Sequence, residues 1–240
     1  MTVVVIHQPN FFPWLGYFDK IRRADVFILL DDVQFPKTGG GWSNRVKVLI
    51  NGEGRWLTAS VDRNFHGKRS INAMFFTSSE DWRGKLLKTL VAAYRRAPFF
   101  EEAFAVLEPL IRNPEENIAR YNGTSITAIA QYLGLPVENF RWSSEFMVAE
   151  HASEMLISLT RAVGGDAYMC GGGALGYQED AAFSAAEIVL IYQNFEHPIY
   201  PQIGSKEFVR GLSIIDALMN IGVVELRSTL NSTADTTKVL

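Results

Sequence analysis

Three polar side chains that could take part in chemistry stand directly after a short apolar segment near the start of the chain. Residues 3–6 are Val-Val-Val-Ile, and His7, Gln8 and Asn10 follow them. An imidazole can transfer a proton near neutral pH, and amide groups can hold the polar groups of a substrate. The simpler interpretation is that these side chains only cap a strand and satisfy the backbone of the next loop.

A pair of carboxylates follows the next apolar segment in the same way. Asp31 and Asp32 come after residues 26–30, Val-Phe-Ile-Leu-Leu. If this segment and residues 3–6 are parallel strands, their carboxyl ends meet at one edge of the sheet, where open α/β folds bind their ligands. We therefore predict His7 as the catalytic acid or base, with Asp32 orienting it. The two carboxylates could instead mark a turn or hold a metal. Two adjacent carboxylates without further ligands are a weak metal motif, and we assign no metal site.

The elements that must position these residues follow from the apolar pattern. Pro13 suits the first turn of a helix over residues 14–21, so the chain begins with strand, helix and strand. Residues 167–170 and 188–192 predict later strands of the same sheet. The sequence thus predicts an α/β fold with a Rossmann-like, mostly parallel sheet.

A β-rich insertion over about residues 42–77 and a helical segment over about residues 81–134 interrupt the parallel pattern. The Asn-Gly pair at 51–52 predicts a hairpin turn, and residues 71–76 predict one more strand. Within the helical segment, we expect a helix to begin at Asn113, an amide side chain that suits an N-cap.

We expect these elements to form a single α/β domain, residues 1–226. A chain of 240 residues is long enough to bury one large core. The last predicted helix covers residues 213–221. Residues 227–240 are polar and rich in Ser and Thr, so we predict a disordered tail there.

Composition excludes several classes of protein. The net charge of −3 gives no electrostatic reason to expect nucleic acid or an anionic membrane as a partner. The single cysteine, Cys170, excludes an intrachain disulfide and a cysteine-cluster zinc site. No apolar segment approaches the ~20 residues that a membrane span needs, and no secretory signal is apparent. We therefore expect a soluble, cytoplasmic protein.

Cys170 stands between a predicted strand and a glycine-rich turn, residues 171–173. A thiol at this position could attack a substrate, with His7 or His197 as the base and Asp32 orienting the base. The turn could equally present backbone N–H groups to an anion. The simpler interpretation is a small buried apolar side chain at the end of a strand.

Several longer motifs resemble the WbqC-like family of bacterial proteins. They are residues 7–20 (HQPNFFPWLGYFDK), residues 31–35 (DDVQF), Trp42-x-Asn44-Arg45, Tyr94-x-x-Ala97-Pro98, residues 165–177, His197-Pro198-x-Tyr200-x-Gln202 and residues 208–222. Together they extend over nearly the whole chain except the tail. The family commonly has Ser where this chain has Cys170, which argues against a required cysteine nucleophile.

What the resemblance implies is a biological context. Members of the family are often encoded beside glycosyltransferases and sugar-modifying enzymes of O-antigen, capsule or other glycan pathways. We therefore predict an enzyme that transfers a group to or from a nucleotide-linked or amino sugar. Such an enzyme could associate with other glycan-biosynthesis enzymes. The alternative is a non-catalytic ligand-binding or assembly partner of a glycan-synthesis complex. No motif identifies a cofactor.

The predicted substrate-binding side chains come from both halves of the chain. They are Gln8, Asn10, Tyr17, Gln34, Trp42, Asn44, Arg45, Tyr168, Gly171, Tyr177, Tyr200 and Gln202. Amides and hydroxyls would hold the polar groups of a small molecule, and Arg45 is the natural partner for an anion.

A fainter likeness connects the N-terminal segment to the His-x-Gly-His nucleotidylyltransferases. The tetrad aligned with their motif is residues 14–17, Trp-Leu-Gly-Tyr, in which aromatic residues replace both histidines. The groups that would stabilise charge on a transferred phosphate are missing, so this likeness predicts at most a degenerate domain of that kind.

Overall fold

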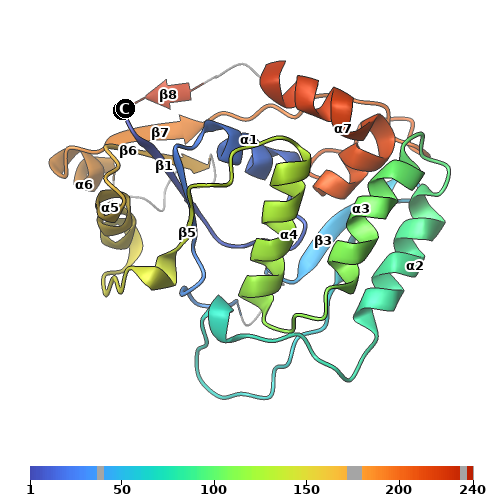
Figure 1. Cartoon of the computed structure of the whole chain (residues 1–240), viewed down its shortest axis with the longest axis horizontal. Coiled ribbons are helices and arrows are strands. Elements are labelled where there is room, and N and C mark those ends of the chain that lie inside the picture. Colours follow the sequence, from blue (N-terminus) through green and yellow to red (C-terminus); the bar gives the residue numbers. More distant parts are fainter. Residues whose placement is uncertain (37–40, 172–179, 233–236, 240) are drawn as a thin grey trace.

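The computed structural model describes residues 1–36, 41–171, 180–232 and 237–239. In these residues a six-stranded sheet has the order β5-β2-β1-β6-β7-β8 (Figure 1). Its strands are β1 (Val3–His7), β2 (Val26–Leu29), β5 (Phe140–Trp142), β6 (Ala167–Gly171), β7 (Val189–Gln193) and β8 (Thr237–Val239). All neighbouring pairs are parallel except β7 and β8, which are antiparallel. The predicted Rossmann-like α/β fold is confirmed.

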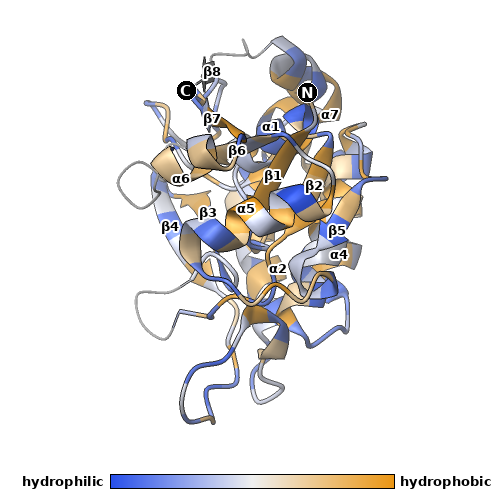
Figure 2. Ribbon diagram, turned by 90° about the vertical axis from the view of Figure 1, so that its left-hand side faces the viewer, coloured by the Kyte–Doolittle hydropathy of each residue, from blue (hydrophilic) through white to orange (hydrophobic). Residues whose placement is uncertain are grey.

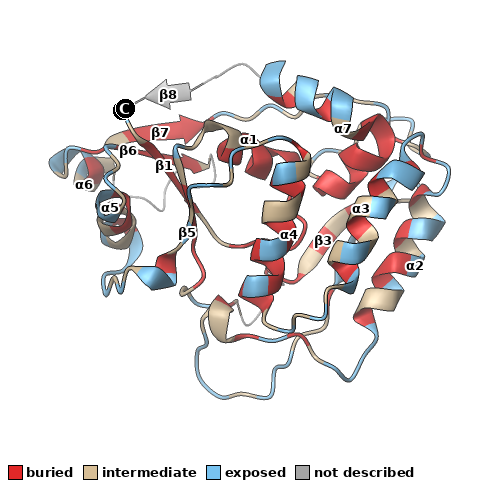
Figure 3. Ribbon diagram, in the orientation of Figure 1, coloured by how far each residue is buried: buried red, intermediate tan, exposed pale blue. Residues whose placement is uncertain are grey.

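The order in which the chain adds strands to the sheet reverses beside β1. The chain moves outward from β1 to β2 and β5, then returns to place β6 on the other side of β1 and β7 beyond it. The carboxyl ends of β1 and β6 therefore flank the topological switch point, where the connections leave in opposite directions and open a crevice. Figure 3 shows that β1, β6 and β7 are buried strands.

Alternating side chains divide the apolar core between the two faces of the sheet. In β1, Val4 and Ile6 pack with α5 (Ala152–Ala162) and α6 (Asp180–Ala185). Val3 and Val5 belong to a larger cluster on the opposite face, which includes α1 (Leu15–Arg23), α4 (Ile118–Tyr132) and α7 (Ile214–Ser232). Figures 1 and 2 show α5 on one side of the sheet, with α1 and α7 on the other. By this alternation, His7 faces α1.

The helical segment forms as predicted, except for one helix start. It comprises α2 (Trp82–Tyr94), α3 (Phe100–Arg112) and α4. The expected N-cap at Asn113 is wrong, because the chain stays extended while Arg83 donates to the carbonyl groups of Asn113 and Glu115. Asn117 caps α4 instead, its side chain accepting from the backbone N–H of Arg120 at 3.1 Å.

The β-rich insertion contains the predicted hairpin but not the extra strand. β3 (Arg45–Ile50) and β4 (Glu53–Thr58) pair antiparallel around the Asn-Gly turn. The strand expected at 71–76 is a 3₁₀ turn, Ile71–Ala73, followed by isolated bridges. Its backbone N–H groups bond to the carbonyl groups of Val33 and Asp31, so no continuous partner strand lies beside it.

The last helix is longer than the sequence predicted. α7 continues past the predicted end at residue 221 through a kink at Gly222, whose φ of 70° suits glycine. Its second half buries Leu226 and Leu230 and ends at Ser232, inside the predicted tail. Residues 233–236 and 240 of that tail lie outside the described part of the chain.

None of the helices in the described ranges combines the length and apolarity needed to cross a membrane.

Candidate functional site

A crevice of about 610 Å³ lies at the carboxyl ends of β1, β6 and β7. Three predicted site residues line it: His7, Tyr168 and Gly171. Cys170 from β6, considered above as a nucleophile, also lines it. The lining residues that the sequence did not predict are Trp14 and Lys20 from the α1 region, Gln193 from β7, Ile6, Asn194 and Phe195. The location at the switch point and the mixture of aromatic and polar side chains make this crevice the candidate site.

Lys20 is the most unusual group in the crevice. Only 5% of the residue is exposed, and among the residues that the structure describes its ammonium group has no hydrogen-bond or ion-pair partner. Burial lowers the pKa of Lys20 from 10.5 to about 8. The ammonium faces Gly171, where a Cβ atom would lie 3.0 Å from Nζ. A side chain at position 171 would therefore crowd the amine.

The acid next to Lys20 in the sequence is already occupied. Asp19 is fully buried and accepts from Arg22 at 3.0 Å and from Gln193 Nε2 at 2.7 Å. Gln193 Nε2 also donates to the carbonyl group of Gly16 at 2.9 Å, which ties α1 to the end of β7. This network fixes the helix that carries Lys20, and its hydrogen bonds occupy the oxygens of the Asp19 carboxylate.

Gly16 lets the Trp14 ring lie over the first turn of α1. A Cβ atom at position 16 would come within 2.2 Å of the Trp14 indole. The ring also packs against Phe195 and His197, with centroid distances of 5.3 and 5.0 Å. Trp14 thus presents a supported aromatic surface at one wall of the crevice.

His7 is held as a neutral imidazole. Its Nδ1 lies 3.1 Å from the Gln8 carbonyl oxygen, which can only accept, so the tautomer protonated at Nδ1 makes this bond. The ring stacks edge-on against Tyr17 at 4.7 Å, and the Tyr17 hydroxyl donates to the same carbonyl at 3.0 Å. The His7 residue keeps some exposure toward the crevice, but the surrounding protein and then the Lys20 charge lower its pKa to about 3.

The predicted pairing of Asp32 with His7 is not formed. Asp32 accepts from the Ser143 hydroxyl at 2.6 Å, at the carboxyl ends of β2 and β5. Ser143 Oγ also lies 3.0 Å from Asp31 Oδ1, and Ser144 donates to the same carboxylate. The two aspartates join neighbouring strand ends on the other side of β1. Within the described ranges, no group of three or more potential His, Cys, Asp or Glu metal ligands is found.

Cys170 lines the crevice as a buried thiol. Its Sγ donates to the Ile191 carbonyl group at 3.6 Å, and only 2% of the residue is exposed. The glycines that follow position 171, and with them Tyr177, lie outside the described residues.

Four predicted residues lie around the hairpin and do not line the crevice. The Arg45 guanidinium lies 4.2 Å from the centroid of Trp56, which Trp42 contacts edge-on at 4.9 Å. Asn10 and Asn44 are buried, and in the described residues the Oδ1 atom of each has no hydrogen-bond partner. Gln8 and Gln34 also stand outside the crevice lining, and Gln34 is exposed.

Tyr200 and Gln202 lie in a separate buried network around Asp216 on α7. One Asp216 oxygen accepts from Tyr94 at 2.9 Å, and the other accepts from Tyr200 and Gln202, also at 2.9 Å each. Burial raises the pKa of Asp216, while these bonds act in the opposite direction. The Tyr94 hydroxyl accepts from the N–H of Leu49, so the network connects α2, α7 and β3.

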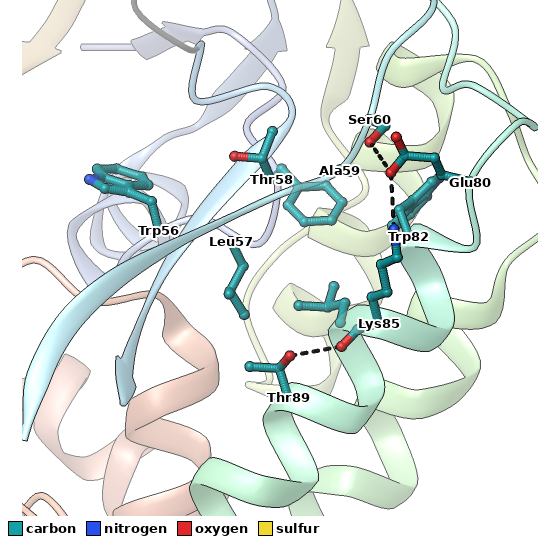
Figure 4. A pocket seen from close by; sticks show the side chains of 11 residues that line it. Trp56, Leu57, Thr58, Ala59, Ser60, Glu80, Trp82, Lys85 and Thr89 are labelled. Atoms are coloured by element: carbon teal, nitrogen blue, oxygen red, sulfur yellow. Dashed lines mark hydrogen bonds and ion pairs between the residues drawn. The ribbon is translucent and has the colours of Figure 1, made fainter. Parts of the chain in front are cut away.

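A smaller cavity of about 310 Å³ lies between β4 and α2 (Figure 4). Its charged groups satisfy one another: Glu80 accepts from Lys85 at 3.2 Å and from Ser60 at 3.1 Å. These bonds hold the pKa of Glu80 below its usual value. Because neither Glu80 nor Lys85 is left unpartnered, this cavity is a weaker candidate than the crevice.

The sequence contained one signal for Lys20 that could have been used. Asp19 and Lys20 are adjacent charges in a helix whose neighbours Tyr17, Phe18 and Ile21 are all large and apolar. Every residue from Leu15 to Ile21 is in fact buried. Charges in a buried turn of helix must find partners or serve a site.

Comparison with known proteins agrees with the motifs. The model of the WbqC-like protein family matches residues 8–228. A protein of Mycobacterium tuberculosis, the uncharacterized protein Rv1507c, is 28% identical over 224 residues, which cover 92% of this chain and 95% of the relative. No solved structure matches the chain. The family match begins directly after β1 and includes the loop that follows it, α1 and the crevice strands β6 and β7. Because it extends over most of the sequence, the chain belongs to the WbqC-like protein family.

Proposed function

We propose that this protein is an enzyme that transfers a group to or from a small activated or amino sugar bound in the crevice at the carboxyl ends of β1, β6 and β7. The observation that carries the proposal is Lys20, a buried amine that opens onto this crevice and has no hydrogen-bond or ion-pair partner within the part of the chain that the structure describes. Strongly shifted ionisable groups in a cleft are typical of functional sites.

The side chains of the crevice suggest distinct roles. Lys20, with a pKa of about 8, can hold or release a proton close to neutral pH. His7 stays neutral at that pH, so its Nε2 atom serves as a hydrogen-bond acceptor for a substrate hydroxyl or amine. Trp14 offers an apolar surface to the substrate.

The sugar part of the proposal depends on the context that the family resemblance implies. Surface-glycan or related small-molecule biosynthesis would supply nucleotide-linked and amino sugars. The proposal also retains the cytoplasmic location and the possible association with glycan-biosynthesis enzymes that were expected from the sequence.

A thermal-shift screen tests the proposal directly. Purified protein is mixed with nucleotide sugars, amino sugars and nucleotides, and a ligand that binds the folded state raises the melting temperature. We expect a hit that is lost in Lys20→Met and Trp14→Ala but kept in Lys85→Met, a variant of the other cavity. Hits are then incubated with acyl and glycosyl acceptors and analysed by mass spectrometry. Hits that persist in both crevice variants would contradict the assignment of the site.

One observation favours a second candidate, a ligand-binding protein without catalysis. His7 has no carboxylate partner among the described residues, and its lowered pKa makes it a poor base. This candidate predicts the same pattern of binding with no product formed under any combination of donor and acceptor.

A further inference from the structure

We infer that the crevice binds the oxyanion of its ligand, a phosphate or carboxylate group, through the Lys20 ammonium. This inference deepens the proposed function, because it names a chemical group that the substrate must carry. It concerns binding only and makes no claim about which bond is formed or broken.

The first argument is the missing counter-charge. Taking an ammonium group out of water is costly unless an anion compensates for the lost hydration. Asp19, the nearest acid in the sequence, attracts the Lys20 charge through space and so raises the pKa of Lys20, but its oxygens accept hydrogen bonds from Arg22, Arg23 and Gln193. Within the described residues, nothing supplies Lys20 with a hydrogen-bonding carboxylate. A bound oxyanion would supply the hydrogen-bonding counter-charge that the described residues do not.

The second argument is the character of the other groups facing the crevice. His7 on β1 is neutral, burial raises the pKa of the Tyr168 hydroxyl on β6, and the Cys170 thiol hydrogen-bonds the Ile191 carbonyl group. No carboxylate lines the described part of the crevice, so no like charge opposes an incoming anion.

The third argument is space at the amine. The backbone of Gly171 closes on Lys20, and a Cβ atom there would lie 3.0 Å from Nζ. Glycine at this position keeps a side chain out of the space beside the ammonium. The crevice volume of about 610 Å³ accommodates an anionic group together with the body of a small molecule.

A bound anion raises the pKa of the lysine beside it, so binding is coupled to protonation. Free Lys20 is charged well below its pKa of about 8 and partly neutral near it. At pH 8 about half of the Lys20 side chains are neutral, so we expect anion binding to take up about half a proton there and no proton near pH 6. Lys20→Arg keeps the charge but cannot titrate in this range, so it separates the charge from the proton uptake.

The experiment is isothermal titration calorimetry with two probes, sulfate as a tetrahedral oxyanion and malonate as a carboxylate. Neither titrates near pH 8, so protons taken up there belong to the protein. Titrations at pH 8 in two buffers of different ionisation enthalpy measure the uptake, and Lys85→Met is the matched control. The preferred probe identifies the phosphate-like or carboxylate source.

We expect at least a tenfold loss of affinity in Lys20→Met, with unchanged binding by Lys85→Met and no proton uptake by Lys20→Arg. Lys20→Gln replaces Lys20→Met if the latter does not fold. Equal affinity in the wild type and Lys20→Met would mean an adventitious ion only and would overturn the inference. It would also be overturned if neither sulfate nor malonate bound to the wild-type protein. Failure to detect sugar transfer leaves this result untouched, so the two proposals fail separately.

Discussion

Two buried ionisable residues on helices, Asp216 of α7 and Lys20 of α1, have opposite surroundings. Asp216 accepts hydrogen bonds from Tyr94, Tyr200 and Gln202, and all four side chains lie within the core or at its border. Lys20 has no such partner in the described residues and opens onto a crevice. A buried charge with its bonds complete stabilises a fold, whereas one left incomplete beside a cavity is prepared for a ligand.

The comparison also divides the family motifs by role. The Tyr94 motif precedes the Tyr200-x-Gln202 motif and Asp216 by more than a hundred residues, and all three meet in one network. That network connects α7 to α2 and to the segment after β7. The motif that contains His7, Trp14 and Lys20 instead lines the crevice.

The largest expected effect follows from breaking the Asp216 network. We expect Asp216→Ala to lower the free energy of unfolding by about 3–5 kcal/mol, because it leaves buried hydroxyl and amide groups without partners. Asp216→Asn, which keeps the shape, should cost less. Urea unfolding measures both. A loss below about 1 kcal/mol for Asp216→Ala would show that these bonds add little to stability.

The next effect is on the pH dependence of stability. The pKa of Lys20 falls from 10.5 to about 8 on folding, so the unfolded chain binds more protons between these pH values and stability rises with pH there. We expect wild-type protein to gain up to about 3 kcal/mol relative to Lys20→Met from pH 8 to pH 10.5. Parallel stability curves for the two proteins would contradict the lowered pKa.

His7 should act at the acid end of the pH range. Its pKa falls from 6.5 to about 3, so stability should be lost as the pH falls through that interval. His7→Gln removes the titrating group, and its unfolding curve should depend less on pH between 6.5 and 3. The measurement is the difference in free energy of unfolding between the two proteins at each pH. No difference in slope would indicate that His7 is hydrated in the folded state.

The smallest effect is expected at the hairpin. Arg45→Ala removes one cation–π contact with Trp56, a partly exposed ring, so we expect a loss of about 0.5–1 kcal/mol. Because Arg45 does not line the crevice, ligand affinity there should be unchanged. A large loss of affinity in calorimetry would restore Arg45 as the anion partner that the sequence suggested.

Much of the fold was accessible from the sequence because it rests on local patterns. Continuous apolar segments identified β1, β2, β6 and β7, and the Asn-Gly pair identified the hairpin. The predictions failed at residues 71–76 and at Asn113, where long-range bonds decide the conformation. Ile71 and Asn72 bond to the segment after β2, and Arg83 holds the carbonyl groups before α4.

The sequence by itself determined that polar side chains follow the strands at one edge of a parallel sheet, since strand ends and turns are set by neighbouring residues. Only the tertiary structure decided which of these side chains share a cavity. Asp31 and Asp32 bond to Ser143, more than a hundred residues away in the chain, so the predicted pairing of Asp32 with His7 is not formed. Asp19 bonds to Gln193, 174 residues away, and so leaves Lys20 without a hydrogen-bonding carboxylate among the described residues. A residue's partner depends on long-range packing, which no local pattern records.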